Sequence, residues 1–236
     1  AMLSPYHDDP KNMGLLLTKP ERLRTLFKTI FDYDFQINIH AIGDRANRIA
    51  LDEFEFAFNS RPKAQTLRNR IEHAQVINLD DIPRFKTLNV LPSMQPTHAT
   101  SDKNMAQDRI GKERLKGAYA WQTFLKQGSK VIAGSDFPVE LANPFFGLHA
   151  AVTRQGRDNQ PESGWIKEES LTIEQAFKAF TLDAAYGGHQ DKILGGLEQG
   201  KWADFILIDQ DIFNIDVKDI WKTNVIETWV AGKKQH

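Results

Sequence analysis

Stretches with apolar residues at helical spacing alternate with short apolar runs over the first 133 residues. The helical spacing predicts four helices, over residues 18–31, 46–58, 79–88 and 112–126. The short apolar runs predict four strands, over residues 35–39, 69–71, 90–94 and 130–133. Because strands and helices alternate, the pattern is typical of an α/β fold with a parallel sheet and crossover helices.

Capping residues mark several helix starts. Thr18 precedes Pro20 and Glu21, which predicts Thr18 as an N-cap with proline in the first turn. Asn78 is the expected cap of the third helix. Further along, Thr172 and Gln175 have the spacing of a capping box and predict a helix that runs to about residue 186.

The last part of the chain has a different pattern. Strands are predicted over residues 204–208 and 225–230 with no helix between them, so they do not continue the alternation. They indicate a small β-structure beside the main fold. We therefore expect one domain over residues 1–194 and a second over residues 195–236.

Composition narrows the function classes. The 236 residues carry a net charge of -1, which argues against a nucleic-acid partner. No apolar run approaches the roughly 20 residues that span a membrane, and no signal peptide is visible, so we expect no membrane partner and a cytoplasmic location. The chain has no cysteine, so any metal must be held by histidine and carboxylate.

Three metal-capable side chains follow predicted strands: His40, His73 and Asp136. The carboxyl ends of parallel strands are where a (β/α) barrel keeps its active site. Imidazole and carboxylate suit a divalent ion such as zinc, and a carboxylate near a zinc-bound water can act as general base. Taken singly, each histidine could be a hydrogen-bonded loop residue and Asp136 a turn residue before Pro138. Together they favour a metal centre.

Other polar residues near these strand ends leave alternatives open. The third strand leads into Gln95 and His98, which we interpret as substrate contacts, although plain exposure in a polar loop explains His98 equally well. Asp44 and Arg45 could orient His40, or could cap the next helix and form a salt bridge there. Glu72 precedes His73 in its strand, so it is expected to face the other way and to be structural.

Four motifs, taken in order, resemble the amidohydrolase superfamily. They are His40–Ala46, Ile71–Ala74, Met94–His98 and Gly134–Val139, and the run Gly195–Phe205 is similar to that superfamily's return into its small β-sandwich. Within the superfamily, the motifs look most like the YtcJ-like branch, which includes N-substituted formamide deformylase. The resemblance covers nearly the whole chain.

The resemblance implies the second half of a TIM-like (β/α)8 barrel, strands 5–8 with their helices, plus C-terminal strands of a β-sandwich. It implies one or two divalent ions, most simply zinc. His40 and His73 would bind one ion, and Asp136 would bind the other and act as catalytic base. The implied activity is hydrolysis of a non-peptide C–N bond in an amide, formamide or cyclic amide, through metal-activated water.

The superfamily's His-x-His motif on strand one is not found among the seven histidines. We therefore expect this chain to be a fragment without turnover, in which the metal can be absent. A non-catalytic regulatory or scaffold module is the alternative, and a split enzyme is a third. Open sheet edges favour association, so self-association or an N-terminal half that completes the barrel is also expected.

Overall fold

The computed structural model describes residues 1–236, which form two compact units. The first unit contains residues 1–94 and 102–131, and the second contains residues 95–101 and 132–236. The sequence pattern predicted a boundary after residue 194, and the two units divide the chain elsewhere. The reason is that helix α7 (Pro144–Thr153) packs against the short 3-10 helix η4 (Val217–Lys222) of the C-terminal region. The helices before residue 194 and the strands after it therefore share one unit.

The first unit is built on parallel strands. They are β1 (Asn38–Ala41), β2 (Arg70–His73) and β3 (Leu91–Met94). Strand β2 lies between the other two, with Ile39 level with Ile71 and Ile71 level with Pro92. The predicted parallel α/β arrangement is confirmed for this unit.

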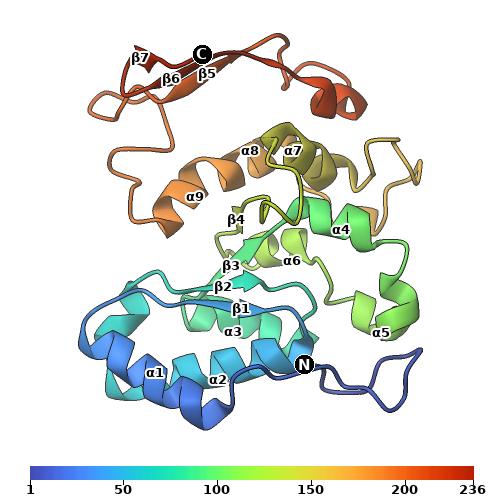
Figure 1. The fold of residues 1–236 in the computed structure, drawn as a ribbon, viewed down its shortest axis with the longest axis vertical. Helices are drawn as coiled ribbons and strands as arrows, with labels where there is room; N and C mark the ends of the chain where they lie inside the picture. The colour runs from blue at the N-terminus through green and yellow to red at the C-terminus, as the bar shows by residue number, and fades with distance from the viewer. The chain divides into compact units, whose positions relative to one another are not determined.

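Helices cover one face of these strands (Figure 1). They are α1 (Pro20–Asp32), α2 (Asp44–Ser60) and α3 (Ile82–Thr87), with the 3-10 helices η1 (Pro62–Thr66) and η2 (Leu79–Asp81) beside them in the chain. An aromatic cluster joins α1 to α2, with the rings of Phe27 and Phe54 centred 4.8 Å apart and those of Phe31 and Phe58 5.9 Å apart. Burial of these rings holds the two helices together.

Two details of the predicted helices are wrong. Helix α1 begins at Pro20 with Lys19 at the N-cap, and no side chain caps it. Proline fits the first helical position, so the N-cap lies one residue after the expected Thr18 and the helix begins at Pro20. The helix predicted over residues 112–126 is instead α5 (Ala106–Leu115) and α6 (Trp121–Lys126). It is interrupted because Ala118 forms a β-bridge with Val76.

The second unit contains the helices α4 (Pro96–Asp102, as far as residue 101), α7, α8 (Ile173–Phe180) and α9 (Leu182–Gly187), the 3-10 helices η3 (Lys167–Glu169) and η4, and the short strand β4 (Ile132–Ala133). The capping box is confirmed, because Thr172 accepts from the Gln175 N–H and the Gln175 side chain accepts from the Thr172 N–H. The helix expected to reach residue 186 breaks at Thr181, whose φ of -121° is not helical.

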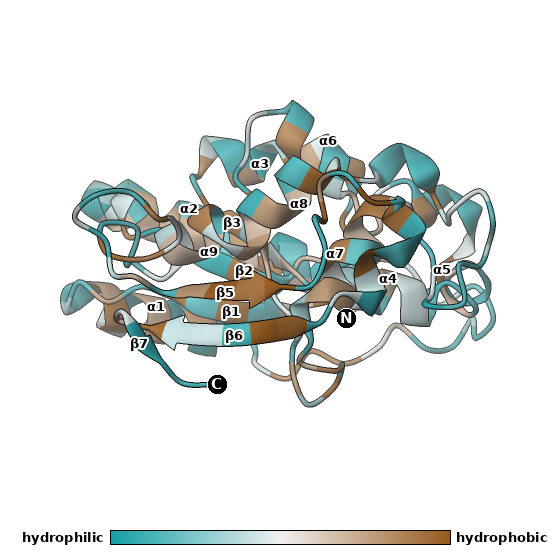
Figure 2. Ribbon diagram, turned by 90° about the horizontal axis from the view of Figure 1, so that it is seen from above, coloured by the Kyte–Doolittle hydropathy of each residue, from teal (hydrophilic) through white to brown (hydrophobic).

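A small antiparallel sheet ends the chain. Its strands are β5 (Phe205–Ile208), β6 (Val225–Val230) and β7 (Lys233–Lys234), paired in that order. The strand β5 is hydrophobic along its length, and one end of β6 is hydrophobic as well (Figure 2). The predicted second β-structure is confirmed, with β7 added.

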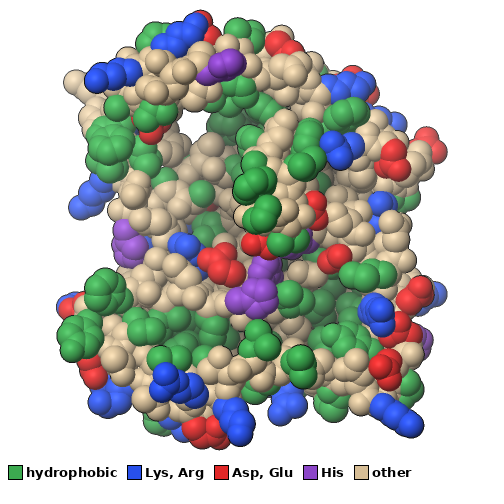
Figure 3. All heavy atoms as spheres, in the orientation of Figure 1, with side chains coloured by type: hydrophobic (Ala, Val, Ile, Leu, Met, Phe, Trp, Pro, Cys, Tyr) green, Lys and Arg blue, Asp and Glu red, His purple; other side chains and the backbone are tan.

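No helix combines the length and apolar character needed to cross a membrane. Basic and acidic side chains are mixed over the visible face of the molecule (Figure 3). This mixture agrees with the near-zero net charge of the chain.

Candidate metal centre

The first unit brings together two histidines from neighbouring strands. His40 lies on β1 and His73 is the last residue of β2, and their ring centroids are 4.3 Å apart in an edge-to-face arrangement. In the sheet His40 is level with Glu72, so regular alternation would turn His40 and His73 to opposite faces. The backbone instead takes positive φ values at His73 (74°) and Ala74 (43°). This turn brings the His73 ring to His40.

A hydrogen-bonded network anchors the segment after this turn. The Asp102 carboxylate oxygen Oδ2 accepts from the Tyr119 hydroxyl at 2.6 Å and from the Gln75 amide at 2.8 Å. The Tyr119 backbone N–H also donates to the Gln75 carbonyl at 2.8 Å. A positive φ at a non-glycine residue costs on the order of 1–3 kcal/mol and persists where surrounding contacts fix it. The network supplies such contacts next to His73.

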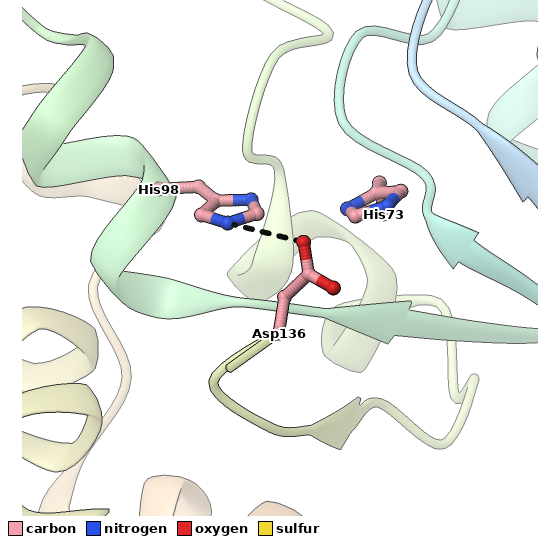
Figure 4. A group of neighbouring side chains, drawn as sticks. All are labelled: His73, His98 and Asp136. Atoms are coloured by element: carbon pink, nitrogen blue, oxygen red, sulfur yellow. Dashed lines mark ion pairs between the residues drawn. The ribbon is translucent and has the colours of Figure 1, made fainter. Parts of the chain in front are cut away.

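The second unit brings together a histidine and a carboxylate. His98 lies in helix α4 and Asp136 follows β4, and His98 Nε2 is 3.7 Å from Asp136 Oδ2. Figure 4 shows the two side chains turned toward each other, and it also labels His73 from the end of β2 in the first unit. The expectation that His98 lies in a loop is wrong. Pro96, at the start of α4, is the sequence signal that could have indicated a helix there.

The remaining predicted residues occupy different positions around these strand ends. Gln95 is buried, and its carbonyl accepts from the His98 backbone N–H. Asp44 begins α2, and its Oδ1 accepts from the backbone N–H groups of Leu3 and Arg45. Gly43 is the N-cap of α2 and no side chain caps the helix, so Asp44 is the first helical residue and not the cap. Arg45 is exposed.

Glu72 is fixed on both sides within the sheet. Its Oε1 accepts from Arg70 Nε and its Oε2 accepts from the Ser93 hydroxyl, each at 2.5 Å. Both oxygens are therefore engaged by neighbours on the same face of the strands. This agrees with the structural interpretation of Glu72.

The side chains present in each unit fit a borderline divalent ion. Their donor atoms are imidazole nitrogens and a carboxylate oxygen, and thiolate is absent. The 3.7 Å between His98 Nε2 and Asp136 Oδ2 is too long for a hydrogen bond. Two ligand atoms on one tetrahedral zinc ion lie roughly 3.4 Å apart, given Zn–ligand distances of about 2.1 Å. The pair could thus accept a metal ion with little movement.

The family comparison covers almost the entire chain. The model of the amidohydrolase family (Amidohydro_3) matches residues 1–234. Among curated proteins, the chain is 34% identical over 230 residues to "Protein LONG AFTER FAR-RED 3" of Arabidopsis thaliana, with 97% of this chain and 39% of that protein covered. It is 30% identical over 229 residues to "Putative amidohydrolase YtcJ" of Bacillus subtilis (strain 168), with 97% and 42% covered.

A solved structure shows the same fold. An uncharacterized metal-dependent hydrolase from Pyrococcus horikoshii OT3 superimposes with a TM-score of 0.80 at 31% identity, over 92% of this chain and 42% of that one. The chain spans about two fifths of the length of these relatives. The family match over residues 1–234 confirms what the four motifs indicated: the chain belongs to the amidohydrolase family.

Proposed function

We propose that this chain supplies metal ligands and the proton-transfer group for hydrolysis of a non-peptide C–N bond, in an amide, formamide or cyclic amide. His40 and His73 are the proposed ligands of one divalent ion, most simply zinc, and Asp136 is the proposed ligand of a second ion and the catalytic base. Gln95 and His98 are the proposed substrate contacts. The observation that carries this proposal is the Asp136 carboxylate opposite the His98 imidazole at 3.7 Å, in a chain of this family.

Asp136 is suited to proton transfer. Its side chain is 38% exposed, so a water molecule can reach the carboxylate. When bound, a divalent ion would lower the pKa of water to about 7 and polarise the substrate carbonyl. Asp136 would accept a proton as the water oxygen bonds to the carbonyl carbon. It would then give that proton to the amine nitrogen as the C–N bond breaks. His98, whose Nε2 is 3.7 Å from Asp136 Oδ2, would contact the substrate beside this carboxylate.

The parallel strands of the first unit fit strands 5–7 of the proposed (β/α)8 barrel, and β4 fits strand 8. An N-terminal half or a second copy of the chain would complete it, and alone the chain is expected to show no turnover. The expected cytoplasmic location belongs to the same proposal, and cell fractionation would check it.

The experiment is a Co²⁺ titration of the metal-stripped chain, followed by visible absorption. Asp136→Asn removes a ligand charge and keeps the side chain's size, and His7→Gln, at an exposed histidine outside the proposed centre, is the matched control. We expect Asp136→Asn to weaken the bound-cobalt signal and His7→Gln to leave it unchanged. Equal Co²⁺ binding by the parent chain and by Asp136→Asn would refute Asp136 as a ligand.

A further inference from the structure

The second unit contains a hollow of about 170 Å³ that has its own polar lining. Its wall includes side chains from several segments: Thr97 on α4, Glu140 in the segment after Asp136, Phe146 on α7 and Arg157 beyond α7. The wall thus combines an aromatic ring with a few polar groups that can orient a small molecule.

Arg157 is the cation of this wall. Its guanidinium carbon lies 4.5 Å from the centre of the Phe146 ring, so the planar group rests on an aromatic face. Neither an ion pair nor a hydrogen bond occupies its N–H groups. A guanidinium presents five donors in a fixed fork that matches a carboxylate. Stacking on Phe146 limits its rotation and prepares the fork for an anion.

A second hydrogen-bonding group in the wall is also unused. The Thr97 hydroxyl oxygen is buried and makes no hydrogen bond. A buried hydroxyl without a partner is unfavourable, so a ligand atom that bonds to it removes part of that cost. The Gln155 amide, by contrast, already donates to the carbonyls of Pro161 and Glu162 at 2.9 and 2.8 Å.

The remaining titratable groups limit the ligand's charge. Burial lowers the pKa of His149, so its ring is neutral near neutral pH and adds no positive charge. Glu140 carries a negative charge in the same wall, and its Oε1 accepts from the Ser101 hydroxyl at 2.7 Å. One cation beside one anion favours a singly charged ligand over a dianion such as phosphate.

The hollow adjoins the segment that carries Asp136. A neighbouring hollow of about 200 Å³ shares Thr97 and Leu141 with it and is also lined by Gly134 and Ser135, directly before Asp136. A molecule held at Arg157 could therefore extend toward Asp136 within the same unit.

We propose that this hollow binds the carboxylate of the substrate, so that the substrate class is a small amide that carries one carboxylate away from the hydrolysed bond. The carboxylate is held by Arg157 in a forked contact and by the Thr97 hydroxyl. The statement that the bound molecule is an amide whose bond is hydrolysed rests on the proposed function. Binding of a carboxylate in this hollow does not, because it needs neither metal nor turnover.

The experiment measures binding of succinamate and of its neutral counterpart succinamide to the metal-stripped chain by calorimetry. We expect succinamate to bind about tenfold more tightly, because a charge-assisted forked contact is about twice as strong as a neutral one. Arg157→Gln should remove this preference and Thr97→Val should reduce it. The control Arg22→Gln, an exposed arginine on α1 of the first unit, should keep it.

Three results would overturn the assignment. These are equal affinity for the two probes, an unchanged preference in Arg157→Gln, and tighter binding of inorganic phosphate than of succinamate. Asp136→Asn separates this proposal from the hydrolytic one. It should keep the preference for succinamate even if metal binding at Asp136 proves wrong.

Discussion

The two units present their candidate ligands in different ways. In the first unit His40 and His73 stand on neighbouring parallel strands, and the hydrogen bonds of β1 and β2 fix the spacing of their backbones. In the second unit His98 comes from helix α4 and Asp136 from the segment after a two-residue strand. One pair is therefore held by a sheet, and the other depends on contacts between a helix and a loop.

This difference matches the roles that we propose. A ligand pair needs fixed geometry, and groups on regular elements hold position better than groups on loops. A group that transfers a proton must reach both the water molecule and the leaving nitrogen. The exposed Asp136 carboxylate, which follows a strand, can reach both. Substitutions in each unit can test this contrast between a rigid histidine pair and an adaptable histidine–carboxylate pair.

The largest expected effect concerns the core that supports the histidine pair. Phe54 on α2 is fully buried against Phe27, whereas Phe56 on the same helix is 52% exposed. We expect Phe54→Ala to lower the free energy of unfolding by about 3–5 kcal/mol. Phe56→Ala should lower it by about 1 kcal/mol or less, through loss of its contact with Arg24. Urea unfolding followed by fluorescence measures both, and similar losses would contradict this picture of the core.

The next prediction compares the two pairs directly. His40→Asn should weaken Co²⁺ binding by roughly 100-fold or more, because it removes a proposed ligand. His98→Asn should weaken it by about 10-fold at most, the lower end of the range for residues next to a ligand, because His98 is proposed to contact the substrate and not the ion. Competition against a chromophoric chelator measures both affinities. A larger loss in His98→Asn would reverse the assignment and make the second unit the main metal holder.

A smaller effect is expected at the helix starts. Thr172→Ala should cost about 1 kcal/mol, because the Thr172 side chain caps α8. Thr18→Ala should cost close to nothing, since Lys19 is the N-cap of α1 and no side chain caps that helix. Thermal unfolding of the two variants beside the parent chain measures both. An equal loss would mean that Thr18 contributes to the first unit in another way.

The last prediction is a pH dependence confined to the second unit. Burial, opposed in part by the hydrogen bond with Asn159, lowers the pKa of His149 below its ordinary value of about 6.5. The unfolded chain therefore binds a proton at a higher pH than the folded chain does. The stability linked to His149 is complete above about pH 6.5 and is lost as the pH falls toward the folded pKa.

His149→Gln should flatten this acid-side decline in Tm, because glutamine does not titrate and its amide can still donate to Asn159. Melting curves between about pH 5 and 8 measure the decline. His189→Gln, at an exposed histidine of the same unit, is the control and should decline like the parent chain. A parallel decline in His149→Gln would show that another group is responsible.

The spacing of apolar residues predicted a helix or strand well where contacts within that stretch of chain determine its structure. The strands β1, β2 and β3 and the helix α2 lie within a few residues of their expected ranges, because their apolar spacing already matches a strand or a helix. The prediction was wrong where contacts between residues far apart in the sequence determine the secondary structure. The pairing of Ala118 with Val76 interrupts one predicted helix, and Pro96–Asp102 form a helix where polar residues indicated a loop.

By itself, the sequence determined which residues can act as ligands, which strand each of them follows, and the family to which the chain belongs. Only the tertiary structure decided which side chains meet. The His73 ring reaches His40 through a positive φ that regular alternation does not produce, and Arg157 rests on Phe146 from beyond the end of α7. The physical reason is that spacing along the chain reflects short-range preferences. Contacts between residues far apart depend on the packing of whole elements, which no local pattern encodes.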